Sequence, residues 1–122
     1  MNEPIEINIF EIVGSEFCVA ADDGQKVFDQ IALALQKGLK VKISFANISR
    51  LTSAFLNVAL GQLYGSFSEQ ILSSNLSVSE IESHDRSLLI RVIETAKAYF
   101  RNPNLFDKVR DNIMGEKKDA DQ

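Results

Sequence analysis

The sequence predicts an α/β fold in which helices pack on a small mixed β-sheet of about four strands. Three observations predict this class. Apolar and polar residues alternate over 39–45, which is typical of a strand with one buried face. Helical spacing of apolar residues precedes this strand, between Gly24 and Gly38, and returns in the long segment His84–Arg101. Strands that alternate with helices favour partly parallel pairing through right-handed crossovers.

The N-terminal segment predicts two strands joined as a hairpin. Isoleucines alternate with other residues over 5–10, and residues 16–21 can return as a second strand after a turn at Gly14-Ser15. Asp22-Asp23-Gly24 then offers N-cap residues for a helix, and Gly38 ends that helix. One face of the predicted helix carries Val27, Phe28, Ile31, Ala34 and Leu35.

The strand over 39–45 leads through a turn at Thr52-Ser53 into a helix over Ala54–Tyr64. The apolar stripe of that helix consists of Phe55, Leu56, Ala59, Leu60 and Leu63. Gly61 and Gly65 weaken the helix by about 1 kcal/mol each relative to alanine, or allow another backbone to approach closely. Residues 66–75 are polar and serine-rich, so we expect a helix end followed by a loop.

The C-terminal third predicts a short strand over 76–81 and the longest helix of the chain. Ser83 is the expected N-cap of helix His84–Arg101. The expected buried face of this helix consists of Leu88, Leu89, Val92, Ile93, Ala96, Tyr99 and Phe100. We therefore divide the chain into one domain over 1–102, a C-terminal helix extension over 103–114 and a charged, disordered tail over 115–122.

Composition narrows the class of protein. Of 122 residues, 45% are hydrophobic and 25% are charged, and the net charge is −4, as expected for a soluble globular domain. The acidic balance argues against a nucleic-acid binder, and no apolar run reaches the roughly 18 residues that span a bilayer. The acidic N-terminus is unlike a signal peptide. A single cysteine suits a reducing compartment, so we expect a cytoplasmic protein.

Most residue types that serve in catalysis or metal binding are rare in this chain or lie in unsuitable surroundings. Cys18 lies in an apolar stretch and is expected to be a small buried hydrophobe. His84 is the single histidine and is expected at the surface, where it lacks the further ligands of a metal site. Asp22-Asp23-Gly24 lacks the additional carboxylates of a calcium loop. Glycine-rich phosphate loops are also missing, so we expect neither a cofactor nor an enzyme.

The Thr52-Ser53 turn is the most informative feature. It places two hydroxyl groups after a strand and at the start of a helix, where unpaired backbone N–H groups and the helix dipole favour an anion. Two explanations stay open. One hydroxyl simply caps the helix, or a hydroxyl is a regulated phosphate acceptor, and the two roles can coexist.

The segment ISRLTSAFLNVALGQLY, directly after the strand, resembles the STAS-like domain of unknown function, a bacterial relative of the anti-sigma-factor antagonist (STAS) domains. The resemblance covers roughly residues 5–100. In STAS antagonists the helix opens with Asp-Ser-Ser-Gly, and a partner kinase phosphorylates the second serine. Thr52 and Ser53 occupy the two serine positions, whereas Leu51 and Ala54 replace the aspartate and the glycine.

The resemblance implies a non-enzymatic regulatory module that docks on a histidine-kinase-like ATPase, with Ser53 as the candidate phosphoacceptor and Thr52 as the second candidate. Docking would use the loop over 48–53 and the exposed face of helix Ala54–Tyr64. The candidate partner-binding residues are Asn47, Arg50, Ala54, Phe55 and Asn57. A small-ligand sensor or a structural subunit of a larger complex is the alternative, because the motif is incomplete. Self-association through Leu105, Phe106 and Val109 also stays open.

Overall fold

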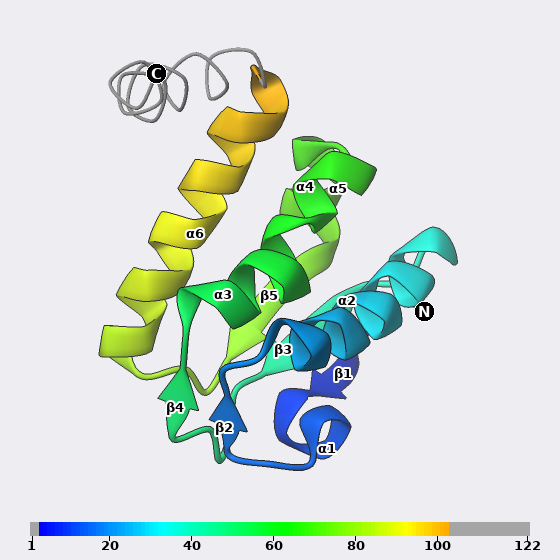
Figure 1. Ribbon diagram of the computed structural model, residues 1–122. Coiled ribbons are helices and arrows are strands. Elements are labelled where there is room, and N and C mark those ends of the chain that lie inside the picture. The colour runs from blue at the N-terminus through cyan, green and yellow to red at the C-terminus, as the bar shows by residue number, and fades with distance from the viewer. Residues whose placement is uncertain (1–2, 103–122) are drawn as a thin grey trace, which may run out of the picture.

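The computed structural model describes residues 3–102, which form one layer of helices against a small parallel sheet (Figure 1). The predicted extension over 103–114 and tail over 115–122 lie outside the described residues. In chain order the elements are β1 (Ile5–Asn8), α1 (Ile9–Val13), β2 (Phe17–Cys18), α2 (Ala21–Gln36), β3 (Val41–Ser44), β4 (Arg50–Leu51), α3 (Ser53–Leu56), the π-helix η1 (Asn57–Gly61), α4 (Leu63–Ser66), α5 (Glu69–Asn75), β5 (Leu76–Ser79) and α6 (Ser83–Arg101).

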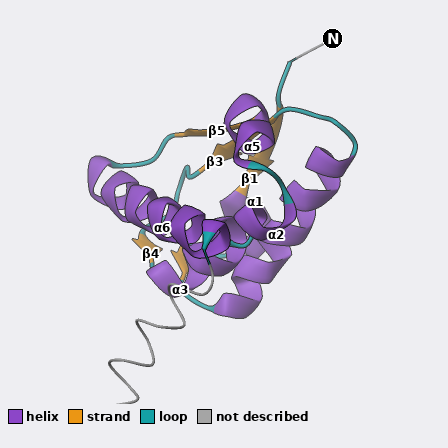
Figure 2. Cartoon of the chain, turned by 90° about the horizontal axis from the view of Figure 1, so that it is seen from above, coloured by secondary structure: helices purple, strands orange, loops and turns teal. Residues whose placement is uncertain are grey.

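The main sheet has three parallel strands in the order β1-β3-β5. Its alternating residues divide into two faces. Ile7, Ile43 and Val78 are register partners and belong to the hydrophobic core or pack against it. Figure 2 shows the helices α2, α3 and α6 gathered on one side of this sheet. Glu6, Lys42 and Ser77 form an exposed polar row on the opposite face. The sheet is therefore covered on one side within the described residues.

The expected single mixed sheet of about four strands is corrected to two parallel sheets of three and two strands. The two-stranded sheet joins β2 to β4, with Phe17 opposite Arg50 and Cys18 opposite Leu51. The predicted hairpin is wrong for the same reason, because β2 pairs with a distant strand instead of turning back on β1. A pairing between residues more than 30 positions apart leaves no signal in local periodicity.

The first strand is also shorter than its isoleucine alternation predicts. It ends at Asn8, whose side-chain Oδ1 accepts a hydrogen bond from the Glu11 N–H at 2.9 Å and caps α1. Helix α1 ends at Gly14, which has the left-handed φ of 78° that glycine favours. Ile9 is fully buried from this helix. A cap at Asn8 thus overrides the period-two pattern that continues to Ile9.

Three other boundaries differ from expectation. Helix α2 begins at Ala21, so the two aspartates lie in its first turn, where their charge suits the dipole, instead of at the cap. The segment expected as a loop contains α5, which Ser68 caps by accepting from the Ile71 N–H at 3.1 Å. Glu82, not Ser83, is the N-cap of α6. The predicted end of α2 is confirmed, since Gly38 has φ 78°.

The core is centred on the contact between α2 and the π-helix η1, the most extensive contact between any two elements of the described chain. The wide turn of η1 is marked by the Gln62 N–H, which donates to the Asn57 carbonyl five residues earlier at 3.0 Å. On the α2 side, Gly24 lies against this segment, and a Cβ there would meet the Phe55 carbonyl oxygen at 2.7 Å. The glycine is therefore required by the closeness of the two backbones.

Helix α6 packs on the other side of η1, and the last turn of α6 contacts α4 and α5 at the surface. A Cβ on Gly65 would meet the Phe100 ring at 2.6 Å, so this glycine makes room for an aromatic side chain. The Arg101 guanidinium donates twice to the Glu69 carboxylate of α5, at 2.6 and 2.7 Å. Tyr99 and Phe100 are 38% and 40% exposed, which corrects their assignment to the buried face.

Alanine substitution of two helical glycines tests the α2–η1 contact. Gly24→Ala is expected to lower stability by about 1–3 kcal/mol, because the new methyl group overlaps the Phe55 carbonyl oxygen. Gly61→Ala is the matched control, since its nearest neighbours lie at 3.7 Å, an ordinary contact. It is expected to raise stability by up to about 1 kcal/mol through helix propensity. Urea unfolding of both variants measures the difference, and equal effects would contradict the close approach.

Candidate functional site

Thr52 connects β4 to the helix that follows, and its side chain and backbone form hydrogen bonds that fix the start of this helix. Its Oγ1 accepts a hydrogen bond from the Phe55 N–H at 3.2 Å, which makes Thr52 the N-cap of α3. The same hydroxyl donates to the Val19 carbonyl at 3.1 Å, and the Thr52 N–H donates to the Cys18 carbonyl at 3.2 Å. The two hydroxyls of the turn therefore differ, and Thr52 has the structural role.

Ser53 is the first residue of α3 and is exposed. Its hydroxyl makes no hydrogen bond with any residue over 3–102, in contrast to the hydroxyl of Thr52. The capping role that the sequence allowed for either residue thus falls to Thr52. Ser53 is left as the hydroxyl that a second protein could reach.

The side chain of Ser53 borders a hollow of about 220 Å³ between α3, η1 and α6. From the helix of Ser53 comes Asn57, one turn further on, and from α6 come Leu88, Arg91, Val92 and Thr95. Arg91 is the one charged residue among those that line it. Their spacing of i, i+3, i+4 and i+7 predicts from the sequence alone that these α6 residues share one face of the helix. The sequence does not predict that this face lies next to Ser53.

The remaining sequence candidates separate in space. Ala54 is exposed beside Ser53, whereas Phe55 is fully buried, so its side chain is withdrawn from the candidate partner surface. Asn47 adopts a left-handed φ of 65° and borders hollows that also contain Glu82, away from the hollow of Ser53. Arg50 is exposed on β4. The structure thus brings Asn57 and Ser53 together and leaves Asn47 apart.

Sequence analysis missed two exposed apolar side chains next to the turn. Phe17 of β2 is 52% exposed and Val19 is 40% exposed. Phe17 is the register partner of Arg50, so both project from the open face of the two-stranded sheet, while Cys18 and Leu51 are buried on the other face. The parallel pairing of β2 with β4 therefore places an aromatic ring and a guanidinium beside the start of α3.

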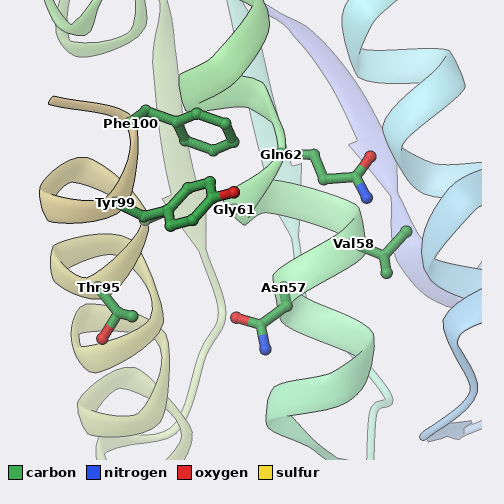
Figure 3. Close-up of a pocket in the computed structure, with 8 residues that line it drawn as sticks. Asn57, Val58, Gly61, Gln62, Thr95, Tyr99 and Phe100 are labelled. Carbon is green, nitrogen blue, oxygen red and sulfur yellow. The ribbon is translucent and has the colours of Figure 1, made fainter. Parts of the chain in front are cut away.

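A second, more apolar groove of about 310 Å³ lies further along the same helix, between η1 and α6. Figure 3 shows Tyr99 and Phe100 projecting from α6 toward the segment that carries Gly61. The two rings contact each other edge to face, with centroids 4.9 Å apart. Asn57, Gln62 and Thr95 contribute polar atoms to the wall. Local π-helices occur often at functional sites, and η1 forms one side of this groove.

Cys18 behaves as the sequence predicts for a buried apolar residue. Its side chain is fully buried, and burial, reinforced by the charge of Asp23, raises the pKa of the thiol to about 11. His84 lies exposed in the first turn of α6. Within residues 3–102 there is no group of three His, Cys, Asp or Glu side chains arranged to hold a metal ion. None of the helices described is both long enough and apolar enough to cross a bilayer.

These features define a small α/β domain in which a strand-to-helix turn carries one hydroxyl that caps the helix and a second, exposed one that makes no hydrogen bond within residues 3–102. A family model described as a STAS-like domain of unknown function matches residues 23–86, more than half of the chain. The chain therefore belongs to this family, as the resemblance of the turn segment indicates. The match runs from the first turn of α2 to the first turn of α6 and includes Ser53, Asn57 and the groove-lining part of η1. Neither a curated protein nor a solved structure matches the chain.

The different roles of Thr52 and Ser53 predict different costs of their removal. Thr52→Ala is expected to destabilise the domain by about 1–2 kcal/mol, because it removes the N-cap bond to the Phe55 N–H and the bond to the Val19 carbonyl. Ser53→Ala is expected to change stability by less than about 0.5 kcal/mol. Thr52→Ser, which keeps the hydroxyl, is the control. Equal losses for the two alanine variants in urea unfolding would show that Ser53 shares the cap.

Burial of Cys18 predicts a stability that depends on alkaline pH. An unfolded thiol ionises near 9.0 and the folded one near 11, so the folded state retains its proton over this range. The contribution of the thiol is complete below pH 9.0 and is lost as the pH rises toward 11. The difference in stability between the unmodified chain and Cys18→Ala should therefore shrink from pH 8 to pH 10.5. A constant difference, or rapid alkylation of Cys18 in the folded protein at pH 8, would contradict this.

Proposed function

We propose that this chain is a non-enzymatic regulatory module that docks on a histidine-kinase-like ATPase and is switched by phosphorylation of Ser53. The observation that carries the proposal is the separation of the two hydroxyls. Thr52 holds the turn through the two hydrogen bonds of its hydroxyl and the bond of its N–H to the Cys18 carbonyl, and Ser53 presents an exposed hydroxyl beside it. Membership of the STAS-like family is in keeping with this position, because the turn segment resembles the STAS motif and the resemblance places Ser53 where antagonists carry the phosphorylated serine.

The docking surface of this proposal surrounds Ser53. It consists of the loop over 48–53, the open face of the β2–β4 sheet and the exposed side of the following helix. Phe17 supplies an aromatic anchor that is more than half exposed, and Arg50 beside it supplies a cation. Aromatic and arginine side chains contribute the most energy in protein interfaces. An apolar centre with a charged neighbour, next to the acceptor hydroxyl, would orient a kinase on Ser53.

The chemical step requires only a hydroxyl from this chain. The Ser53 Oγ would attack the γ-phosphorus of ATP bound to the partner, forming the Oγ–P bond while the bond to the β-phosphate oxygen breaks. ADP leaves, and the hydroxyl proton passes to a base of the partner. The product carries about −1.5 to −2 additional charge at pH 7. That charge stands within the proposed docking surface, so it changes the affinity for whatever binds there.

The chain's own nucleophiles and bases support a non-enzymatic role. The thiol of Cys18 is buried and remains protonated, since its pKa is about 11, so it is unsuited to attack a substrate. His84, the single histidine, lies exposed at the start of α6 and does not border the hollow of Ser53. The residues that line the hollow of Ser53 in the described part of the chain include no histidine or carboxylate that could act as its general base, as suits a hydroxyl that a partner activates.

A small-ligand sensor or a structural subunit is the second candidate, and the groove between η1 and α6 favours it. A volume of about 310 Å³ with two aromatic side chains on its wall is sufficient for a small apolar ligand. A thermal-shift screen against nucleotides and lipids separates the candidates. A ligand that raises the melting temperature, with no phosphate gained by the chain in a lysate containing ATP, would favour the sensor.

The first experiment incubates the immobilised chain in a bacterial lysate with and without ATP and measures its intact mass. We expect ATP-dependent gain of one phosphoryl group at Ser53 and capture of a histidine-kinase-like ATPase. For the isolated partner, Ser53→Asp is expected to lower affinity at least tenfold, about 1.4 kcal/mol, whereas Ser53→Ala retains it.

Gln30→Glu is the control for this measurement, because it adds one negative charge on the exposed side of α2, outside the proposed docking surface. It should bind as the unmodified chain does. Unchanged affinity for both Ser53 variants would place the interface elsewhere, and a stable partner that ignores ATP would overturn the phosphorylation switch.

A further inference from the structure

The hollow beside Ser53 joins two elements that are far apart in the sequence. Ser53 and Asn57 come from the helix after β4, and the opposite wall comes from α6, about 40 residues later. Figure 1 shows α6 running alongside the helix that begins at α3, and these two elements contact each other directly. A group added to the Ser53 hydroxyl therefore faces α6 as well as solvent.

The α6 wall combines anchoring residues with polar ones. Val92 is buried in the core and Leu88 packs partly against it, so this part of the helix is fixed in position. Arg91 and Thr95, one turn apart, are exposed at the hollow. Arg91 makes no ion pair with any other residue over 3–102, although Arg101 on the same helix does. Its guanidinium is thus available to a new anion at this place.

The hollow suits a phosphoryl group in size and composition. Its volume of about 220 Å³ leaves room for a phosphoryl group. Asn57 and Thr95 can donate hydrogen bonds, Arg91 can donate two in parallel, and the lining contains no carboxylate. Arg50, the other nearby cation, does not line the hollow.

We propose that Arg91 binds the phosphoryl group of phosphorylated Ser53, with Asn57 and Thr95 as additional donors. The inference rests on the proposed phosphorylation of Ser53 and specifies its structural consequence. The phosphate would link the start of α3 to the middle of α6 and would be partly neutralised there. Phosphorylation would then act by tightening α6 against the docking helix, in addition to placing charge on the surface.

The test needs neither the kinase nor the partner. Phosphoserine is incorporated at position 53 during translation of the full chain, and its second ionisation, near pH 6 in a free phosphoserine, is followed by ³¹P NMR. A bound guanidinium favours the dianion, so the pKa of the phosphate should be about half a unit to one unit lower in the folded chain than in the chain unfolded in urea. The phosphorylated chain should also melt at a higher temperature than its Arg91→Gln variant.

Three arginine variants assign the effect. Arg91→Gln is expected to raise the pKa of the phosphate toward its value in urea, and only the part of the lowering that the start of the helix contributes should remain. Arg86→Gln, on the same helix but outside the hollow, and Arg50→Gln, on β4, should leave it lowered. A pKa that is the same in folded and unfolded chains, or one that responds to Arg50 instead of Arg91, would overturn the proposal. A lowered pKa together with absent kinase docking would refute the proposed function while leaving this contact established.

Discussion

The close packing of α2 on η1 is the constraint on which the rest of the structure depends. The two backbones approach so closely that Gly24 has no room for a Cβ against the Phe55 carbonyl oxygen. On its opposite side η1 packs against α6, where a Cβ added to Gly61 would lie 3.7 Å from the Ala96 Cβ, an ordinary contact. The continuous helical segment formed by α3 and η1 is thus held between the two long helices α2 and α6. This segment begins at Ser53, so the packing of the core fixes the position of the candidate hydroxyl.

At the start of this segment two adjacent residues have different roles: Thr52 stabilises the turn, and Ser53 is the candidate functional residue. The Thr52 hydroxyl caps the helix and donates a hydrogen bond to the Val19 carbonyl, so it connects the helix to the segment that follows β2. Ser53, which is not the cap, presents an exposed hydroxyl beside it. The leucine and alanine that replace the aspartate and glycine of the STAS motif fit this division, because Leu51 is buried in the core and Ala54 is exposed beside the serine.

Local periodicity predicted some elements well and failed where a single capping residue started a helix. The alternation over 39–45 is β3, and the glycine at position 38 ends α2 as expected. The isoleucine alternation at the N-terminus instead breaks at Asn8, because a side-chain cap starts a helix there. The polar stretch 66–75 contains α5 for the same reason, since Ser68 supplies a cap that composition alone understates. Caps are single-residue features, whereas periodicity averages over many residues.

The sequence by itself determined the α/β class, the strand-to-helix turn with two hydroxyls and the family, because these depend on residues that are neighbours in the chain. Only the tertiary structure decided that β2 pairs with β4, that Thr52 and not Ser53 is the cap, and that Arg91 lies across a hollow from Ser53. The strand pairing and the hollow depend on contacts between segments some 30 to 40 residues apart, and so does the second bond of the Thr52 hydroxyl, to the Val19 carbonyl. Such contacts arise from how helices and strands share one core, which the spacing of residues along a single segment does not specify.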